Sequence, residues 1–184
     1  MRKLIAAMNM TLDGVCDHTV MDADDEIHQH YNELLSQSGT LIYGRTTYQL
    51  MESYWPTVVK TPTGNQSTDV FATLIDNIEK VVFSNTLQNV SWKHARLATN
   101  NIREEILALK QQPGKDILVG SPSLIAATAN LHLVDEYQFS IHPIIAGKGL
   151  LLFKNITDTI RLTLVKTKPF ACGAVTFYYE PVKS

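Results

Sequence analysis

The sequence predicts a three-layer α/β domain, in which helices cover both faces of a mostly parallel sheet that gains antiparallel strands at its C-terminal end. Short apolar runs alternate with helical patterns as far as about residue 130, as expected of parallel strands joined by helical crossovers. Three strand-like segments then follow without intervening helices, and the last two form a hairpin pattern around Gly173. The 184 residues suit one domain, which we assign to residues 1–184.

The first half of the chain contains two strand–helix units. Residues 3–8 form an apolar run typical of a buried strand. Asp24 is then placed to cap a helix whose apolar residues share one face: Ile27, Tyr31, Leu34 and Leu35. Residues 41–43 predict a second strand, followed by a helix that ends near Ser53. Residues 54–68 contain prolines and a glycine, so we expect a long surface loop there.

The second half of the chain predicts shorter units. Strands are expected at residues 80–84, 95–98 and 117–119. Before the last of these, Asn100 or Asn101 is placed to cap a helix that ends at Pro113-Gly114. Ser121 puts a capping hydroxyl directly before Pro122, which predicts a helix through residue 130. The C-terminal strands are expected at residues 136–142, 161–167 and 174–180.

Composition narrows the classes of function. The formal net charge of −2 provides no positive field for nucleic acid or a membrane surface, so we expect a small-molecule partner. The apolar run at residues 4–8 is too short for a signal peptide, and no stretch has the length of a membrane span, which predicts a cytoplasmic protein. Cys16 and Cys172 are far apart and belong to no metal-ligand motif, so neither a disulfide framework nor a metal site is indicated.

Two glycines each stand between a predicted strand and the start of a predicted helix. Gly44 precedes Arg45-Thr46-Thr47, and Gly120 precedes Ser121-Pro122-Ser123. In parallel α/β sheets such junctions lie at the carboxyl ends of the strands, where helix N–H groups and the helix dipole attract anions. Arg45 adds a planar set of donors suited to phosphate, and the two threonines add neutral donors. The junctions therefore predict a phosphate-binding site.

A simpler interpretation stays open for either junction taken alone, since a glycine there is often only a turn and an arginine a solvated charge. Standard nucleotide motifs give no support. The P-loop pattern does not occur, and Gly147-Lys148-Gly149 lacks the third glycine and the strand–turn–helix setting of a dinucleotide fingerprint. Leu124 stands where the nucleophile elbow of a serine hydrolase needs its second glycine, which argues against that class.

Several segments resemble a known family in their order along the chain: LIAAMNMTLDG, LIYGRTTYQLM, VVFSNTL, ILVGSPSLI, LVDEYQFSIHPIIAGKGLLLF and GAVTFYY. Together they resemble the dihydrofolate reductase superfamily, and especially the reductase domain of bacterial riboflavin-biosynthesis deaminase-reductases. The resemblance covers essentially the whole chain. Its most specific piece is LVDE followed by Pro143, Gly147-Lys148-Gly149 and Phe153, which is typical of the riboflavin branch.

This resemblance implies a dihydrofolate-reductase-like fold that binds NADPH. It implies that the Gly44 junction, with Arg45, Thr46 and Thr47, contacts the adenosine 2′-phosphate and the pyrophosphate. Ser84 and Asn85 are then expected beside the adenine ribose. The pyrophosphate and the nicotinamide half are expected at the turn formed by Gly120, Ser121, Pro122, Ser123 and Leu124. Asp13 matches an acidic residue near the substrate in the riboflavin branch, although the residues alone predict an Asp-Gly turn equally well.

We therefore expect an NADPH-dependent oxidoreductase that transfers a hydride to a C=N or C=O group of a small molecule. His28 occupies the position of the folate-reductase carboxylate, so dihydrofolate reduction is the less expected activity. Gly120 directly follows Val119 where riboflavin-type reductases usually have an acid. The alternatives are 5-amino-6-(5-phosphoribosylamino)uracil reduction in riboflavin biosynthesis and NADP(H) binding without catalysis. The resemblance also implies a homodimer, formed by residues 137–141 and the terminal hairpin.

Overall fold

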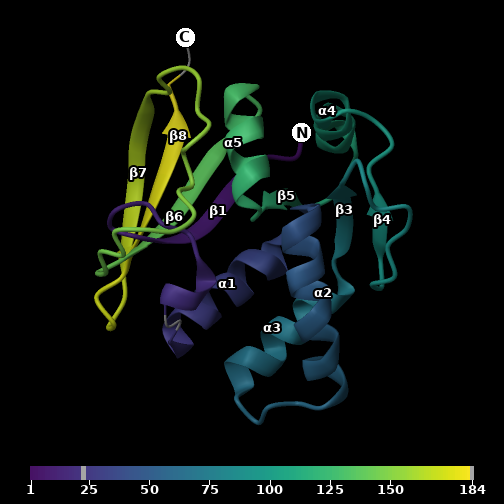
Figure 1. The fold of residues 1–184 in the computed structure, drawn as a ribbon, viewed down its shortest axis with the longest axis horizontal. Coiled ribbons are helices and arrows are strands. Elements are labelled where there is room, and N and C mark those ends of the chain that lie inside the picture. The colour runs from purple at the N-terminus through teal and green to yellow at the C-terminus, as the bar shows by residue number, and fades with distance from the viewer. Residues whose placement is uncertain (22–23, 183–184) are drawn as a thin grey trace.

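The computed structural model describes residues 1–21 and 24–182, which build an eight-stranded mixed sheet with helices on both faces (Figure 1). The strands are β1 (Leu4–Thr11), β2 (Ser38–Gly44), β3 (Glu79–Phe83), β4 (Ala95–Leu97), β5 (Asp116–Val119), β6 (Glu136–His142), β7 (Leu162–Pro169) and β8 (Val175–Pro181). Their order across the sheet is β4-β3-β2-β5-β1-β6-β8-β7. The strands from β4 to β6 pair in parallel, whereas β8 is antiparallel to both β6 and β7. The predicted fold class is confirmed.

The helices are divided between the two faces of the sheet. They are α1 (Asp25–Gln37), α2 (Arg45–Lys60), α3 (Gln66–Asn77), α4 (Ile102–Gln111) and α5 (Pro122–Asn130), with a short 3-10 helix at His18–Val20. Alternate residues of β1 serve opposite faces: Ile5 and Ala7 pack with α1, α2 and α3, and Leu4 and Ala6 pack with α4 and α5. None of the helices within the described residues is long and apolar enough to cross a membrane.

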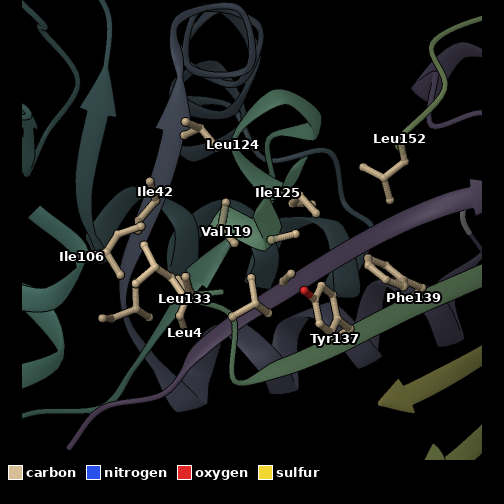
Figure 2. Close-up of a cluster of buried hydrophobic side chains, with 14 of the residues drawn as sticks. Leu4, Ile42, Ile106, Val119, Leu124, Ile125, Leu133, Tyr137, Phe139 and Leu152 are labelled. Atoms are coloured by element: carbon tan, nitrogen blue, oxygen red, sulfur yellow. The ribbon is translucent and has the colours of Figure 1, made fainter. Parts of the chain in front are cut away.

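The larger hydrophobic cluster lies on the α4–α5 face of the sheet. Figure 2 shows Leu4, Ile42 and Val119 from three neighbouring strands meeting Ile106 of α4 and Ile125 of α5, and all five side chains are fully buried. Each such side chain stabilises the fold by about 1.5–3 kcal/mol through removal of apolar surface from water. This cluster holds the ends of β2 and β5 in fixed positions beneath the glycine junctions.

The expectation that residues 137–141 form a dimer contact is wrong. β6 lies inside the sheet between β1 and β8, so neither of its edges is free. Tyr137 and Phe139 are buried in the same cluster as Leu4 (Figure 2). These aromatic side chains are already used within the subunit, and within the predicted interface the exposed element is the edge strand β7.

The predicted loop at residues 54–68 is also wrong for most of its length. α2 continues to Lys60 with Pro56 inside it, and α3 occupies residues for which no helix was predicted. Packing outweighs the backbone hydrogen bond that Pro56 removes, because the ring of Trp55 packs at a tilt against the ring of Phe71 of α3, with ring centroids 4.5 Å apart. The signal for α3 was present, since Asn65 caps it by accepting a hydrogen bond from Thr68 N.

His30 of α1 makes stability depend on pH. Its side chain is buried beside the rings of Phe170 and Tyr178. Burial, followed by the positive charge of Lys168, lowers the pKa of His30 from 6.5 to about 4. Between these two pH values, His30 is neutral in the folded protein, whereas the same side chain in the unfolded chain is already protonated. Above pH 6.5, His30 is neutral in both states and does not favour unfolding. As the pH falls from 6.5 toward 4, protonation of His30 in the unfolded chain progressively lowers the free energy of unfolding.

We expect the free energy of unfolding to fall by up to about 3 kcal/mol between these two pH values because of His30. His30→Phe removes the titrating group and should remove this part of the pH dependence. His18→Gln, at an exposed position, is the control and should keep it. Urea unfolding at a series of pH values measures the effect. A His30→Phe profile that still follows the wild-type profile across this interval would contradict the assignment.

Candidate functional site

The two glycine junctions lie side by side at the carboxyl ends of neighbouring strands. β2 pairs with β5, and the Gly44 N–H donates a hydrogen bond to Ser121 Oγ over 3.0 Å. A Cβ atom on Gly44 would lie 3.4 Å from Ser123 Oγ, so a longer side chain would fill the space between the two turns. The absence of a side chain at Gly44 keeps this space open to a ligand.

The first turns of α2 and α5 differ from those of the other helices. Asp24, Asn65 and Asn101 cap α1, α3 and α4 by accepting a backbone N–H. Among the described residues, no side chain caps α2 or α5. The prediction that the Ser121 hydroxyl caps α5 is therefore wrong, because this hydroxyl accepts the N–H at the end of β2 instead. Two sets of helix N–H donors consequently stay available at the same edge of the sheet.

Arg45 reaches from α2 toward the end of β3. Its Nη1 donates to Thr86 Oγ1 over 3.0 Å, and the side chain is otherwise exposed. Ser84 shapes the turn that carries Thr86, since its Oγ accepts hydrogen bonds from Thr86 N and Leu87 N at 3.1 and 3.0 Å. Arg45 is thus held at one end while its remaining N–H groups can bind an anion. Thr46 is exposed beside it, and Thr47 is partly buried.

A groove of about 800 Å³ opens beyond Arg45, between the ends of β3 and β4 and the start of α4. Its walls combine apolar and polar side chains: Phe83, Ser84, Asn85, Ala98, Asn100, Asn101, Ile102, Arg103 and Leu131. This volume is typical of small-molecule sites. The sequence analysis identified Ser84 and Asn85 only through the family resemblance. It missed Arg103, because the position of this residue on α4 looks the same in the sequence as that of an ordinary surface arginine. Arg103 Nη2 donates to Leu131 O across the groove.

The other end of the site lies against β1. A Cβ atom on Gly120 would lie 3.8 Å from Ala7 O, so the turn after β5 sits directly beside the middle of β1. Pro122 takes the first position of α5, and Ser123 is exposed at the cleft. Leu124 is buried in the hydrophobic cluster, and its Cγ would lie 3.8 Å from a Cβ atom on Gly44, so its side chain borders the space between the two turns.

Asp13 lies at the end of β1, in the turn that the sequence predicted. Gly14 has a φ of +83° and donates its N–H to Thr11 O. The Asp13 carboxylate accepts hydrogen bonds from Thr11 Oγ1 at 2.6 Å, Gly147 N at 2.7 Å and Ala146 N at 3.1 Å. These bonds, that from Thr11 first, lower the pKa of Asp13 to about 2. The carboxylate is therefore ionised at neutral pH, and it ties the loop after β6 to the end of β1.

The model of the RibD C-terminal domain family matches residues 2–176. The YyaP protein of Bacillus subtilis (strain 168) is 36% identical over 187 residues, which cover 97% of this chain and 95% of the relative.

Two solved structures show the same fold. The first is a diaminohydroxyphosphoribosylaminopyrimidine deaminase/5-amino-6-(5-phosphoribosylamino)uracil reductase from Thermotoga maritima. It is 17% identical with a TM-score of 0.68, over 98% of this chain and 57% of that one. The second is the dihydrofolate reductase of Enterococcus faecalis in complex with NADP(H). It is 15% identical with a TM-score of 0.68, over 98% and 97% of the two chains. With its family match over almost the whole length and its dihydrofolate-reductase-like fold, the chain belongs to the RibD C-terminal domain family.

Proposed function

We propose that this protein is an NADPH-dependent reductase that adds a hydride to the carbon of a C=N or C=O group in a small molecule. The observation that carries the proposal is the pair of uncapped helix N-termini that meet where Gly44 N–H contacts Ser121 Oγ. Converging N–H donors and an arginine fit a dinucleotide carrying an additional phosphate. Membership in a family whose solved relatives include reductases supports the same activity.

The described residues fit each part of such a cofactor. The groove with Ser84 and Asn85 would hold the adenosine, and Arg45 with Thr46 would hold its 2′-phosphate. The N-termini of α2 and α5 would share the pyrophosphate, because the two turns are already in contact. The nicotinamide would then lie near Gly120 and β1, where it supplies the hydride when bound. The protein's own contribution is to bind, orient and exclude water.

Asp13 has a positioning role in this proposal. Its carboxylate holds Ala146 and Gly147 against the end of β1, close to the side of the sheet where the nicotinamide would lie. Because its pKa is about 2, it does not serve as the proton donor of a reduction near neutral pH.

The riboflavin intermediate is the second candidate substrate, favoured by the family match and by the Thermotoga maritima relative. Binding of NADP(H) without catalysis is the third possibility. One experiment separates all of them: NADPH absorbance is followed on purified protein with a panel of carbonyl and imine compounds, the ribosylamino-pyrimidine phosphate and dihydrofolate. Turnover identifies the substrate class, whereas NADPH that binds but is never oxidised would overturn the reductase proposal. We expect little or no turnover of dihydrofolate.

Arg45→Ala should raise the dissociation constant for NADPH by about tenfold to a little over a hundredfold. The physical reason is the loss of a charge-assisted hydrogen bond to the 2′-phosphate, worth about 1.5–3 kcal/mol. NADH has no phosphate at this position, so its affinity should stay almost unchanged. Fluorescence titration with both cofactors measures the difference.

Arg161→Ala, an exposed arginine outside the site, is the matched control and should change neither affinity. Equal weakening of NADPH and NADH by Arg45→Ala would mean that Arg45 only holds Thr86 and the turn after β3. An unchanged affinity for both cofactors would show that Arg45 does not contribute to cofactor binding.

The exposed hairpin supports the further proposal of a homodimer. β7 is an edge strand of the sheet, and its Leu164 and Val165 side chains are 49% and 57% exposed. Such an edge is commonly covered by a second copy of the chain. Light scattering at micromolar concentration should give a dimer mass for the wild type and for Leu107→Lys on α4. Leu164→Lys or Val165→Lys should shift the mass toward the monomer. A monomeric wild type would contradict the proposal.

A further inference from the structure

The groove of about 800 Å³ beyond Arg45 has an apolar floor. Four partly buried apolar side chains line it and pack against the larger hydrophobic cluster beneath them: Phe83, Ala98, Ile102 and Leu131. A floor of this kind suits one face of a planar base, because bases stack on apolar and aromatic side chains whatever their edges carry. The floor can therefore hold a base but cannot identify it, and identification depends on the polar rim.

A buried carboxylate shapes that rim. Glu105 of α4 is buried, and its Oε1 lies 2.7 Å from Arg96 Nη2. Its Oε2 accepts hydrogen bonds from Asn100 N at 3.3 Å and from Asn100 Nδ2 at 3.2 Å. Burial disfavours the charged form, but the hydrogen bond and the charge of Arg96 outweigh burial and lower the pKa of Glu105. The carboxylate is therefore ionised at neutral pH and can only accept hydrogen bonds.

The contact with Glu105 fixes the orientation of the Asn100 amide. Because Glu105 Oε2 can only accept, the NH2 group of Asn100 must face it, and the same group donates to Thr99 Oγ1 over 3.4 Å. The amide oxygen of Asn100 then points away from Glu105, and no donor among the described residues reaches it. Asn100 is exposed and lines the groove. The rim thus carries an acceptor whose direction is set by a buried group.

The next residue, Asn101, presents the complementary group. Its Oδ1 caps α4 by accepting a hydrogen bond from Glu104 N over 3.0 Å. The NH2 group of Asn101 is therefore turned away from this N–H, and it has no acceptor among the residues that the structure describes. Asn101 lines the same groove. An amide acceptor and an amide donor consequently follow one another along one rim, each oriented by a hydrogen bond within the protein.

We propose that Asn100 Oδ1 accepts a hydrogen bond from the amino group of adenine while Asn101 Nδ2 donates to the adjacent ring nitrogen, which rests on the NADPH-dependent function proposed above. Adenine carries this pair, an amino donor beside the acceptor nitrogen N7. Hypoxanthine and guanine carry an oxygen in place of the amino group, so two acceptors would face one another at Asn100. The groove therefore selects an aminopurine over an oxopurine, and Glu105 acts through Asn100 as a positioning residue.

NADPH and its hypoxanthine analogue, in which an oxygen replaces the amino group of adenine, test this inference. Fluorescence titration of the wild type should give a dissociation constant about threefold to tenfold lower for NADPH, as expected for one neutral hydrogen bond. Asn100→Ala should remove most of this difference. Asn89→Ala is the matched control, because Asn89 is an exposed asparagine between β3 and β4 that does not line the groove, and it should keep the difference. Equal affinities in the wild type, or an unchanged difference in Asn100→Ala, would overturn the inference.

Glu105→Gln tests the positioning role. A glutamine side chain can donate or accept, so it no longer holds the Asn100 amide in one orientation. The preference for NADPH over the hypoxanthine analogue should fall in this variant, although both asparagines are still present. If Glu105 only stabilises the fold, both dinucleotides should weaken equally and their ratio should stay as in the wild type, which would contradict the positioning role.

The wild-type titration also separates this inference from the reductase proposal. If NADPH binds with no preference over its hypoxanthine analogue, only the inference about the rim fails. If neither dinucleotide binds, the reductase proposal fails as well.

Discussion

A hydrogen bond of 3.0 Å from Gly44 N–H to Ser121 Oγ joins the ends of β2 and β5, and most of the candidate site depends on it. The bond fixes the spacing of two turns that belong to separate strand–helix units. It also uses the one side chain that stands at the N-cap position of α5, so the first-turn N–H groups of that helix are not capped from within. A single hydroxyl therefore aligns the two helix ends and leaves their donors free for an anion. Gly44 contributes by having no side chain in the space between them.

The two faces of β1 have different roles: one face packs in the larger hydrophobic cluster, and the other carries polar side chains near the candidate site. Leu4 and Ala6 belong to the hydrophobic cluster with α4 and α5, which anchors the strand. Figure 2 shows Leu4 within this cluster. On the other face, Ile5 and Ala7 are apolar, but the pattern changes to Asn9 and Thr11 toward the carboxyl end. This change occurs where α/β sheets usually bind ligands. The start of β1 is therefore anchored by apolar packing, and its end carries neutral polar side chains, so the strand places no charged group in the core.

Sequence patterns were sufficient for the sheet and for the junctions, because both depend on local signals. Apolar runs predicted the strands, and the glycines before Arg45 and Ser121 predicted the two junctions that meet at the candidate site. The extension of α2 through Pro56 was missed because a tertiary contact, Trp55 with Phe71, stabilises it. The groove was only partly predictable, since Arg103 reaches it through the packing of α4 beside β3 and β4. The contact between His142 Nε2 and Asn9 Oδ1 was missed because it depends on strand register between residues more than 130 positions apart.

The central place of β1 has a consequence for how the protein folds. β1 lies between β5 and β6, so a strand made first during synthesis has no neighbour until residues 116–119 and 136–142 have left the ribosome. Until then both backbone edges of an apolar segment are unpaired, which favours association with other chains. Pairing over such sequence separations is slow, because the entropy of closing a long loop is lost before any contact forms. The strand at the centre of the folded sheet is therefore the one whose backbone edges stay unpaired for longest during synthesis.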